Sequence, residues 1–305
     1  MFFRNLSLFR FSPATSSDLA NVETSLDQHR LRPCGPIEMM TRGFVSPFGR
    51  DSDELVHRVG DFTLFTVGGE DKLLPSSVIN DELANKLAEI TEKEARRVGA
   101  RERKRLKDEV LTDLLPRAFV RSTRQFAYLD LAQGWIVIDT ASRKNAEEAV
   151  SQVRDAVGRF PATPLAPEES PRALLTQWLA SGKLPANLVL GDECELRDPA
   201  ESGAIVRCRR QDLELDEIKE HLKSGKQVFQ LGLTFDDRID FVLGEDLVIR
   251  KLRFLDIVLD EIDESSLESA RAELDATFLL MTGEIRRLLE ALESWFNIKR
   301  PTDQA

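Results

Sequence analysis

The spacing of hydrophobic and polar residues changes several times along this chain, and each spacing predicts a type of element. Apolar and polar residues alternate in residues 1 to 11, and an aromatic and β-branched run fills residues 62 to 67, so we predict two strands. Gly68-Gly69 is expected to form the turn after the second strand. Between the strands, residues 16 to 28 have one apolar face and predict a short helix.

An interrupted helical stripe runs through residues 76 to 115. The apolar stripe stops at Ile90, and Val98 is the only large apolar residue before Leu106, where the stripe resumes. A helix that is polar on all sides must be solvated, project from the body or face a charged ligand. We therefore expect a helical hairpin that projects as an arm, with its turn at residues 98 to 100.

The rest of the chain keeps strands and helices in separate blocks. In chain order the predicted elements are a β-hairpin at 125 to 139, helices at 143 to 157 and 172 to 180, a strand at 204 to 209, a helix at 214 to 224, a β-meander at 227 to 254 and a long helix at 266 to 296. Segregated strands and helices favour the α+β class, with antiparallel sheets, packed helices and the projecting arm.

The chain divides into four parts on this pattern. Residues 1 to 75 and 117 to 165 are expected to form one central α+β domain, and the helical arm of residues 76 to 116 is inserted between them. Residues 166 to 305 are expected to form a C-terminal α+β domain. Prolines spaced through residues 161 to 171 mark the boundary between the two domains.

Composition points to a soluble, reducing environment. No apolar run approaches the roughly 18 residues of a membrane span, and Arg4 interrupts the apolar start, so neither a span nor a signal peptide is expected. The cysteines Cys34, Cys194 and Cys208 are odd in number and outside C-x-x-C pairs. We expect all three to be free and buried in a cytoplasmic protein.

Charge is distributed unevenly. The formal net charge is -11, yet residues 93 to 124 hold eleven Lys or Arg against five Asp or Glu, a local charge of +6. Positive charge concentrated in one part of an acidic protein suits a polyanion. The charge pattern therefore predicts a surface for nucleic acid.

Three clusters are the candidate DNA contacts. The arm supplies Arg97, Arg101 and Lys104, the segment after it supplies Arg117, Phe119, Arg121 and Arg124, and a strand end supplies Arg207, Arg209, Arg210 and Gln211. A Phe among arginines can stack on a base while guanidiniums hold phosphates. The alternatives are that Phe119 belongs to the core and that the cations form ordinary solvated faces.

The search for catalytic chemistry is negative. The chain has neither a P-loop nor a dinucleotide-binding glycine pattern, and its three histidines are far apart in sequence. Asp212 with Glu217-x-Lys219 resembles part of a metal-dependent nuclease motif, but Glu217 and Lys219 lie in a segment of helical period, whereas that chemistry needs them on a strand. We expect no enzyme, no catalytic residues, no metal site and no cofactor.

Several segments in one order along essentially the whole chain are recognisable together: Phe3-Arg4-Asn5-Leu6, Pro33-Cys34-Gly35, Lys72 to Ile79, Leu106 to Val110, Leu114 to Phe119, Arg210-Gln211-Asp212-Leu213, Lys251-Leu252-Arg253-Phe254 and Leu280 to Glu284. In these segments the chain resembles the recombination-associated protein RdgC family of bacteria.

The resemblance implies a non-enzymatic protein whose two subunits form a ring-shaped homodimer around DNA. It implies binding of single- and double-stranded DNA with little sequence preference, antagonism of RecA-mediated strand exchange, and a cytoplasmic, nucleoid-associated location. The family's gate phenylalanine corresponds to Phe119, at a dimer contact. The family's basic-Gln pair corresponds to Arg210-Gln211, where this chain has Arg in place of the commoner Lys.

A second class of function stays open. The acidic residues Asp256, Asp260, Glu261, Asp263 and Glu264 predict a surface for a basic partner. On that alternative the chain is a protein-interaction module that binds a recombination protein directly, without DNA.

Overall fold

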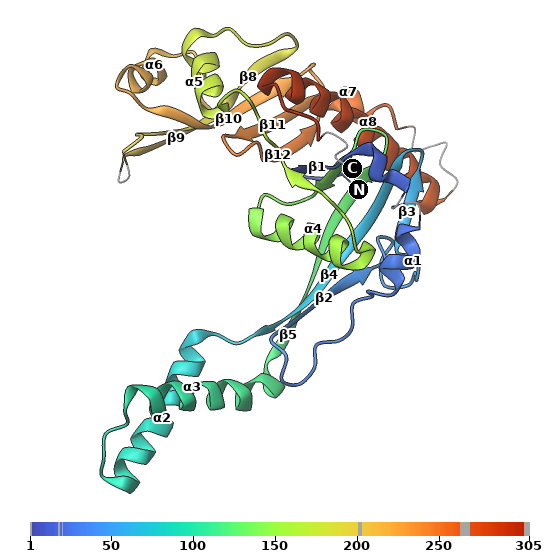
Figure 1. Ribbon diagram of the computed structural model, residues 1–305. Coiled ribbons are helices and arrows are strands. Elements are labelled where there is room, and N and C mark those ends of the chain that lie inside the picture. Colours follow the sequence, from blue (N-terminus) through green and yellow to red (C-terminus); the bar gives the residue numbers. More distant parts are fainter. Residues whose placement is uncertain (1, 18, 20, 201–202, 263–268, 302–305) are drawn as a thin grey trace.

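The computed structural model describes residues 2–17, 19, 21–200, 203–262 and 269–301. Two antiparallel sheets and the arm follow one another along a crescent, as Figure 1 shows. The second sheet and the arm lie at the two ends of the crescent, and the first sheet lies between them. Within the described residues, no helix has both the length and the apolar composition needed to cross a bilayer.

The first sheet has the strand order β2-β4-β5-β6-β1-β7, and β3 pairs with β4 beside this path. Its strands are β1 (Ser7–Arg10), β2 (Met40–Val45), β3 (Val56–Val59), β4 (Phe62–Leu73), β5 (Phe119–Asp130), β6 (Trp135–Ile138) and β7 (Thr163–Pro164). One face of this sheet packs in a core with α1 (Val22–Asp27) and α4 (Arg143–Val157). A 3-10 helix, η1 (Pro13–Ser17), precedes α1.

The second sheet has the strand order β12-β11-β10-β8-β9. Its strands are β8 (Leu188–Arg197), β9 (Ile205–Arg209), β10 (Gln227–Phe235), β11 (Ile239–Gly244) and β12 (Ile249–Phe254). The helices of this part are α5 (Pro171–Ser181), α6 (Asp216–Lys223), α7 (Asp256–Leu259) and α8 (Ala270–Phe296). The α+β class, the meander, and the helices of residues 143 to 157 and 172 to 180 are confirmed.

The arm is a pair of helices that projects from the first sheet. It consists of α2 (Ser76–Glu94), α3 (Ala100–Leu114) and a 3-10 turn, η2 (Leu115–Arg117). Leu83, Leu106 and Val110 are buried where the helices meet, whereas the other faces are polar. The predicted hairpin is confirmed, with its turn at residues 95 to 99.

The expected turn at Gly68-Gly69 is wrong, because both glycines lie inside β4. Strand β4 continues to Leu73 and pairs along its whole length with β5, so β5 begins at Phe119 rather than near residue 125. A Cβ on Gly68 would come within 2.7 Å of Val45 on β2. Glycine here permits close packing between strands instead of reversing the chain.

Other boundaries also differ from the predictions. The strand expected at residues 1 to 11 is limited to β1, and the helix expected at 16 to 28 is divided into η1 and α1. Strands β2, β3 and β8 were not predicted. The long helix begins at Ala270, and residues 266 to 268 lie outside the described part. Cys194 and Cys208 are buried as expected, but Cys34 is half-buried in a loop, where its thiol donates to the Glu38 carbonyl oxygen.

Helix α8 packs against both sheets and joins them into one core. Its Phe278 ring lies against Phe62 and Tyr128 of the first sheet, with centroids 6.3 and 6.0 Å apart. Near its other end, Trp295 lies 5.7 Å from Phe235 of the second sheet. Aromatic contacts at both ends thus hold the sheets to the same helix.

Buried ion pairs reinforce this attachment. Arg10 of β1 has 2% of its side chain exposed and contacts Glu293 of α8 at 2.8 Å. Its guanidinium also lies over the Trp135 ring and donates to the Gln133 carbonyl oxygen. About two turns earlier in α8, Arg286 donates two hydrogen bonds to Asp130 of β5, at 2.7 and 2.8 Å.

Replacing Glu293 by Gln should destabilise the fold, because Arg10 would keep its buried charge without a counterion. We expect the free energy of unfolding to fall by about 3 kcal/mol, as for other broken buried pairs. Urea denaturation followed by circular dichroism measures it. Glu290→Gln, on an exposed position of the same helix, is the matched control. Equal stabilities of the two variants would contradict the role of the Arg10–Glu293 pair.

His57 should make stability depend on pH. Burial between Phe48 and Phe278 lowers the pKa of His57, although Asp275, 3.0 Å away, opposes this shift. As the pH falls below about 6.5, His57 becomes protonated in the unfolded chain before it does in the folded protein, so the free energy of unfolding falls. Above that pH His57 is neutral in both states, and its effect on the free energy of unfolding vanishes. Urea melts at pH 7.5, 6.5 and 5.5 should show a smaller fall for His57→Gln. An unchanged pH dependence in this variant would refute the assignment.

Candidate nucleic-acid interface

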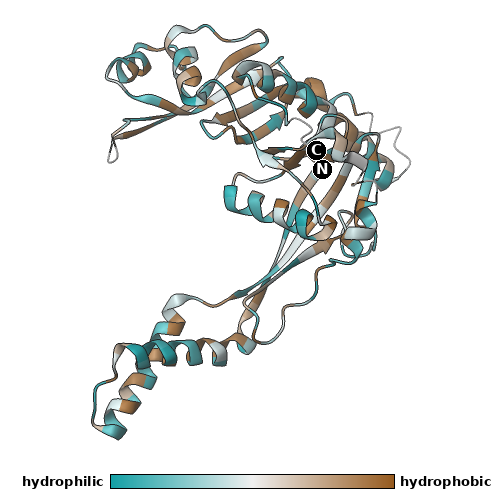
Figure 2. Cartoon of the chain, viewed as in Figure 1, coloured by the Kyte–Doolittle hydropathy of each residue, from teal (hydrophilic) through white to brown (hydrophobic). Residues whose placement is uncertain are grey.

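The arm presents three exposed cations that no carboxylate of the described residues neutralises. Arg97 lies in the turn, and Arg101 and Lys104 lie on α3; all three are exposed, and within the described part of the chain none makes an ion pair. In Figure 2 most of α3 is drawn in hydrophilic colours. These three residues are the arm contacts predicted from sequence, and their charges are available to an anion.

Other cations of the arm are already paired. Arg96 bridges Glu94 and Glu102 at 2.5 and 2.7 Å, and these hydrogen bonds raise its pKa further. Lys93 pairs with Glu89 one helical turn earlier. Only part of the local charge of +6 is therefore available to a ligand, because the paired cations stabilise the arm itself.

Phe119 is exposed at the junction of arm and sheet. Its exposed fraction is 83%, so the alternative that it belongs to the core is wrong. Phe119 pairs with Leu73 in the β4–β5 ladder and is followed by Val120. On the other side of β4, the amide of Lys72 donates to the carbonyl oxygen of Met39, the residue before β2. Five exposed apolar side chains lie at this end of the ribbon: Met39, Met40, Leu73, Phe119 and Val120. Strand alternation puts Met40, Leu73 and Phe119 on one face and Met39 and Val120 on the other, and we call the first three the ribbon patch. Such a patch is typical of a contact surface.

The three arginines around Phe119 have different surroundings. Arg117 is exposed in η2, and Arg121 lies 3.5 Å from Asp71. Arg124 donates to the Ser46 carbonyl oxygen, and burial lowers its pKa. Arg124 lines a cavity of about 310 Å³ with Arg121 and Lys144, the latter from α4. Lys144 was missed by the sequence analysis, because nothing in the local pattern of α4 distinguishes it from a solvated helix charge.

In the second sheet, carboxylates neutralise some of the predicted arginines and not others. Arg207 of β9 donates to Glu195 of β8 at 2.6 Å, and Arg197 shares the same carboxylate. Arg209 and Arg210 are exposed, and within the described residues neither has an ion-pair partner. Of the predicted arginines here, these two offer a full charge to phosphate.

Gln211 is anchored rather than free. Its amide nitrogen donates to Glu217 at 3.1 Å, and its backbone N–H donates to the Asp192 carbonyl oxygen. This anchoring holds the chain directly after Arg210. The predicted residues do not converge on one site: the arm and β9 are at opposite ends of the crescent (Figure 1), so one subunit carries three separate basic surfaces.

The nuclease-like residues lack the required geometry. Glu217 and Lys219 lie on helix α6, in agreement with their helical period, and not on a strand. Across the residues that the structure describes, no group of three or more His, Cys, Asp or Glu side chains is placed to hold a metal ion. The carboxylate of Glu217 instead accepts a hydrogen bond from Gln211.

The acidic surface of the alternative hypothesis is only partly described. Asp256 and Asp260 are exposed at the two ends of α7, beside Ile257 and Leu259, which are also exposed. Glu261 is paired with Arg238 at 2.5 Å. Asp263 and Glu264 lie outside the described residues.

Comparisons with known proteins agree over nearly the whole chain. Residues 1–299 match the family described as "RdgC: Putative exonuclease, RdgC". A protein named "Recombination-associated protein RdgC" from Xanthomonas campestris pv. campestris (strain B100) is 55% identical over 301 residues, covering 98% of this chain and 99% of its own length. Proteins of the same name from Xanthomonas axonopodis pv. citri (strain 306) and Stenotrophomonas maltophilia (strain R551-3) are 54% and 51% identical, with the same coverage.

Proposed function

The chain belongs to the RdgC family of recombination-associated proteins, and on that premise we propose that it binds DNA without catalysing a reaction. The proposed ligand is single- or double-stranded DNA, bound through its phosphates with little sequence preference. The observation that carries the proposal is a set of exposed cations on an acidic chain, at Arg97, Arg101 and Lys104 and at Arg209 and Arg210, none of which is ion-paired within the described residues. Phosphate contacts position a protein on DNA without reading its sequence.

A ring-shaped homodimer would bring the separate basic surfaces around one duplex. Two-fold closure of a crescent needs two self-complementary contacts, one at each end. The ribbon patch, with Phe119 at its edge, is the proposed contact near the arm, and the second sheet's end of the crescent would supply the other. Encirclement also explains how an acidic protein can hold DNA, because the basic residues would face the enclosed space.

Restraint of RecA follows from occupancy in this proposal. A ring on DNA competes with RecA for the same phosphates, which would reduce strand exchange and place the protein at the nucleoid. The competing proposal is direct binding of a basic partner at α7, favoured by the exposed Ile257 and Leu259 between Asp256 and Asp260. The two proposals differ in whether DNA affinity is needed for activity.

Affinity for DNA should fall steeply with salt, and charge reversal at Arg209 and Arg210 should weaken it. We expect a linear decrease of log K with log salt concentration, with a slope of about −0.9 for each duplex phosphate neutralised. Arg209→Glu with Arg210→Glu should make this slope shallower by about 2 and reduce inhibition of RecA-promoted strand exchange. Fluorescence anisotropy with a labelled duplex and a labelled single strand measures both affinities.

The matched control for charge reversal is Arg159→Glu with Lys183→Glu, two exposed cations outside the predicted surfaces that, within the described residues, also make no ion pair. No binding at low salt would refute the DNA proposal, and undiminished RecA inhibition by the Arg209/Arg210 variant would favour the α7 surface. Mg²⁺-dependent shortening of the labelled DNA, lost in Glu217→Ala, would contradict the non-enzymatic assignment.

Phe119→Ala should weaken the dimer without disturbing the subunit fold. The ring is exposed, so its removal leaves no cavity, and the far-ultraviolet circular dichroism spectrum should be unchanged. An interface aromatic truncated to Ala typically costs about 2 kcal/mol or more, so the dimer dissociation constant should rise at least about 30-fold. Sedimentation over a concentration series measures it. An unchanged dissociation constant would exclude Phe119 from the dimer contact.

A further inference from the structure

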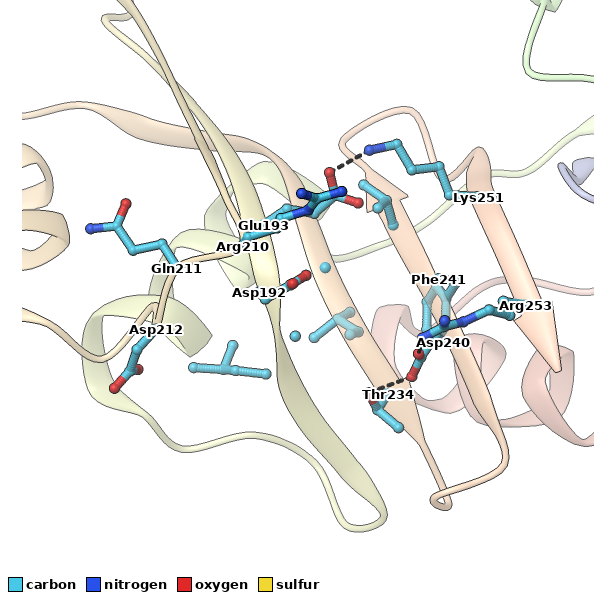
Figure 3. A pocket seen from close by; sticks show the side chains of 15 residues that line it. Asp192, Glu193, Arg210, Gln211, Asp212, Thr234, Asp240, Phe241, Lys251 and Arg253 are labelled. Carbon is cyan, nitrogen blue, oxygen red and sulfur yellow. Dashed lines mark hydrogen bonds and ion pairs between the residues drawn. The ribbon is translucent and has the colours of Figure 1, made fainter. Parts of the chain in front are cut away.

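The open face of the second sheet has a groove that begins at the predicted contacts Arg210 and Gln211 and extends beyond them over residues that were not predicted. It is a cavity of about 810 Å³ over β8, β10, β11 and β12. Figure 3 shows three cations around it: Arg210 after β9, and Lys251 and Arg253 on β12. Only Arg210 was expected from the sequence.

Two glycines lie in the floor of the groove. Gly191 of β8 and Gly232 of β10 lie close together, and a Cβ on Gly191 would come within 2.9 Å of the Gly232 carbonyl carbon. The β8–β10 register shifts between Leu231 and Leu233, which brings the two strands into this close approach. Glycine is therefore required, and the groove stays open above the backbone.

Two of the three cations reach the groove through a disfavoured backbone conformation. Arg210 has φ 54° and Lys251 has φ 52°, both in the left-handed region that non-glycine residues rarely adopt. At Lys251 the β11–β12 register shifts, so that Arg250 and Lys251 both avoid the core while Leu252 enters it. Without this bulge, strict alternation would direct Lys251 toward the core.

Carboxylates from other strands of the same sheet hold two of these cations. Lys251 pairs with Glu193 of β8, and Arg253 pairs with Asp240 of β11, which also accepts a hydrogen bond from Thr234 (Figure 3). The cations are largely exposed, at 56% and 71%, whereas the side chains of Glu193 and Asp240 are 21% and 28% exposed. The carboxylates are thus fixed in the sheet, and the longer cationic side chains can turn away from them.

We propose that this groove is an additional binding surface for the phosphodiester backbone of DNA, whose affinity Glu193 and Asp240 restrain by competing with phosphate for Lys251 and Arg253. The inference rests on the proposed function and adds the regulation of one surface. Arg210, which has no ion-pair partner among the described residues, lines the same groove, so a strand held there would also meet the paired cations.

The competition has a physical reason. Exposed ion pairs contribute little to stability, so exchange of a carboxylate for a phosphate is readily reversible. Asp192 and Asp212 also line the groove, so its carboxylates outnumber its cations. While Glu193 and Asp240 remain paired with Lys251 and Arg253, these two cations offer little net charge to a ligand. A phosphate then gains little. Removal of one carboxylate should therefore strengthen DNA binding, which a simple cationic channel does not predict.

The test is a double-mutant cycle on Glu193 and Lys251 in the full chain, with duplex affinity measured by anisotropy across salt. Glu193→Gln should raise affinity up to about eightfold at 0.1 M salt and steepen the salt slope by about 0.9, the effect of one more phosphate contact. In the Lys251→Gln background this gain should disappear, because the released cation is absent. Asp240→Asn should behave in the same way with respect to Arg253→Gln.

The control is Glu220→Gln, which changes net charge equally but breaks the exposed Glu220–Lys223 pair on α6, outside the groove. Thermal unfolding of each variant verifies folding. A gain equal to that of Glu220→Gln, or one that persists without Lys251, would overturn the inference while leaving the proposed function intact. Failure of the unsubstituted protein to bind DNA would instead refute the proposed function.

Discussion

The arrangement of the whole molecule depends on a short N-terminal segment that belongs to both sheets. Leu6 exchanges two backbone hydrogen bonds with Ile249 of β12, and the residues directly after it pair with β6 as β1. Helix α8 packs across the same junction, where the buried Arg10 meets Glu293. Because backbone hydrogen bonds and a buried ion pair act at one place, the two sheets have little freedom to turn relative to each other. Their fixed relation puts the arm and β9 at opposite ends of the crescent.

Electrostatics divides the basic residues into structural and available ones. Arg96 and Arg207 are held by carboxylates a few ångströms away, whereas Arg101 and Arg209 are exposed within the described chain without such partners. The net charge of a segment therefore overstates what a polyanion can contact. Lys251 belongs to neither group, because it is paired with Glu193 but its side chain is exposed while that of Glu193 is fixed in the sheet. In the proposal above, a bound phosphate would replace Glu193 as the partner of Lys251.

The long helices and the meander were predicted well from the sequence, whereas the number and boundaries of the other strands were predicted poorly. The arm, α4, α5 and the meander follow from apolar spacing sustained over many residues. Gly68-Gly69 misled the prediction, since a glycine pair is typical of turns, and only the packing of β4 between β2 and β5 explains it. Strand β8 was missed because Gly191 and the acidic residues of its open face hide the alternation. The candidate arginines were found from local clusters, whereas Lys144 was not.

The sequence by itself determined the α+β class, the projecting arm, the family and the clusters of positive charge, because each depends on residues close together in the chain. Only the tertiary structure decided which charges are neutralised, that Phe119 is exposed and not buried, and that Lys251 joins Arg210 around one groove. These properties depend on which strands become neighbours. The folded sheet brings Glu193 of β8 within reach of Lys251 of β12 although two strands separate β8 from β12, and local spacing carries no record of such contacts.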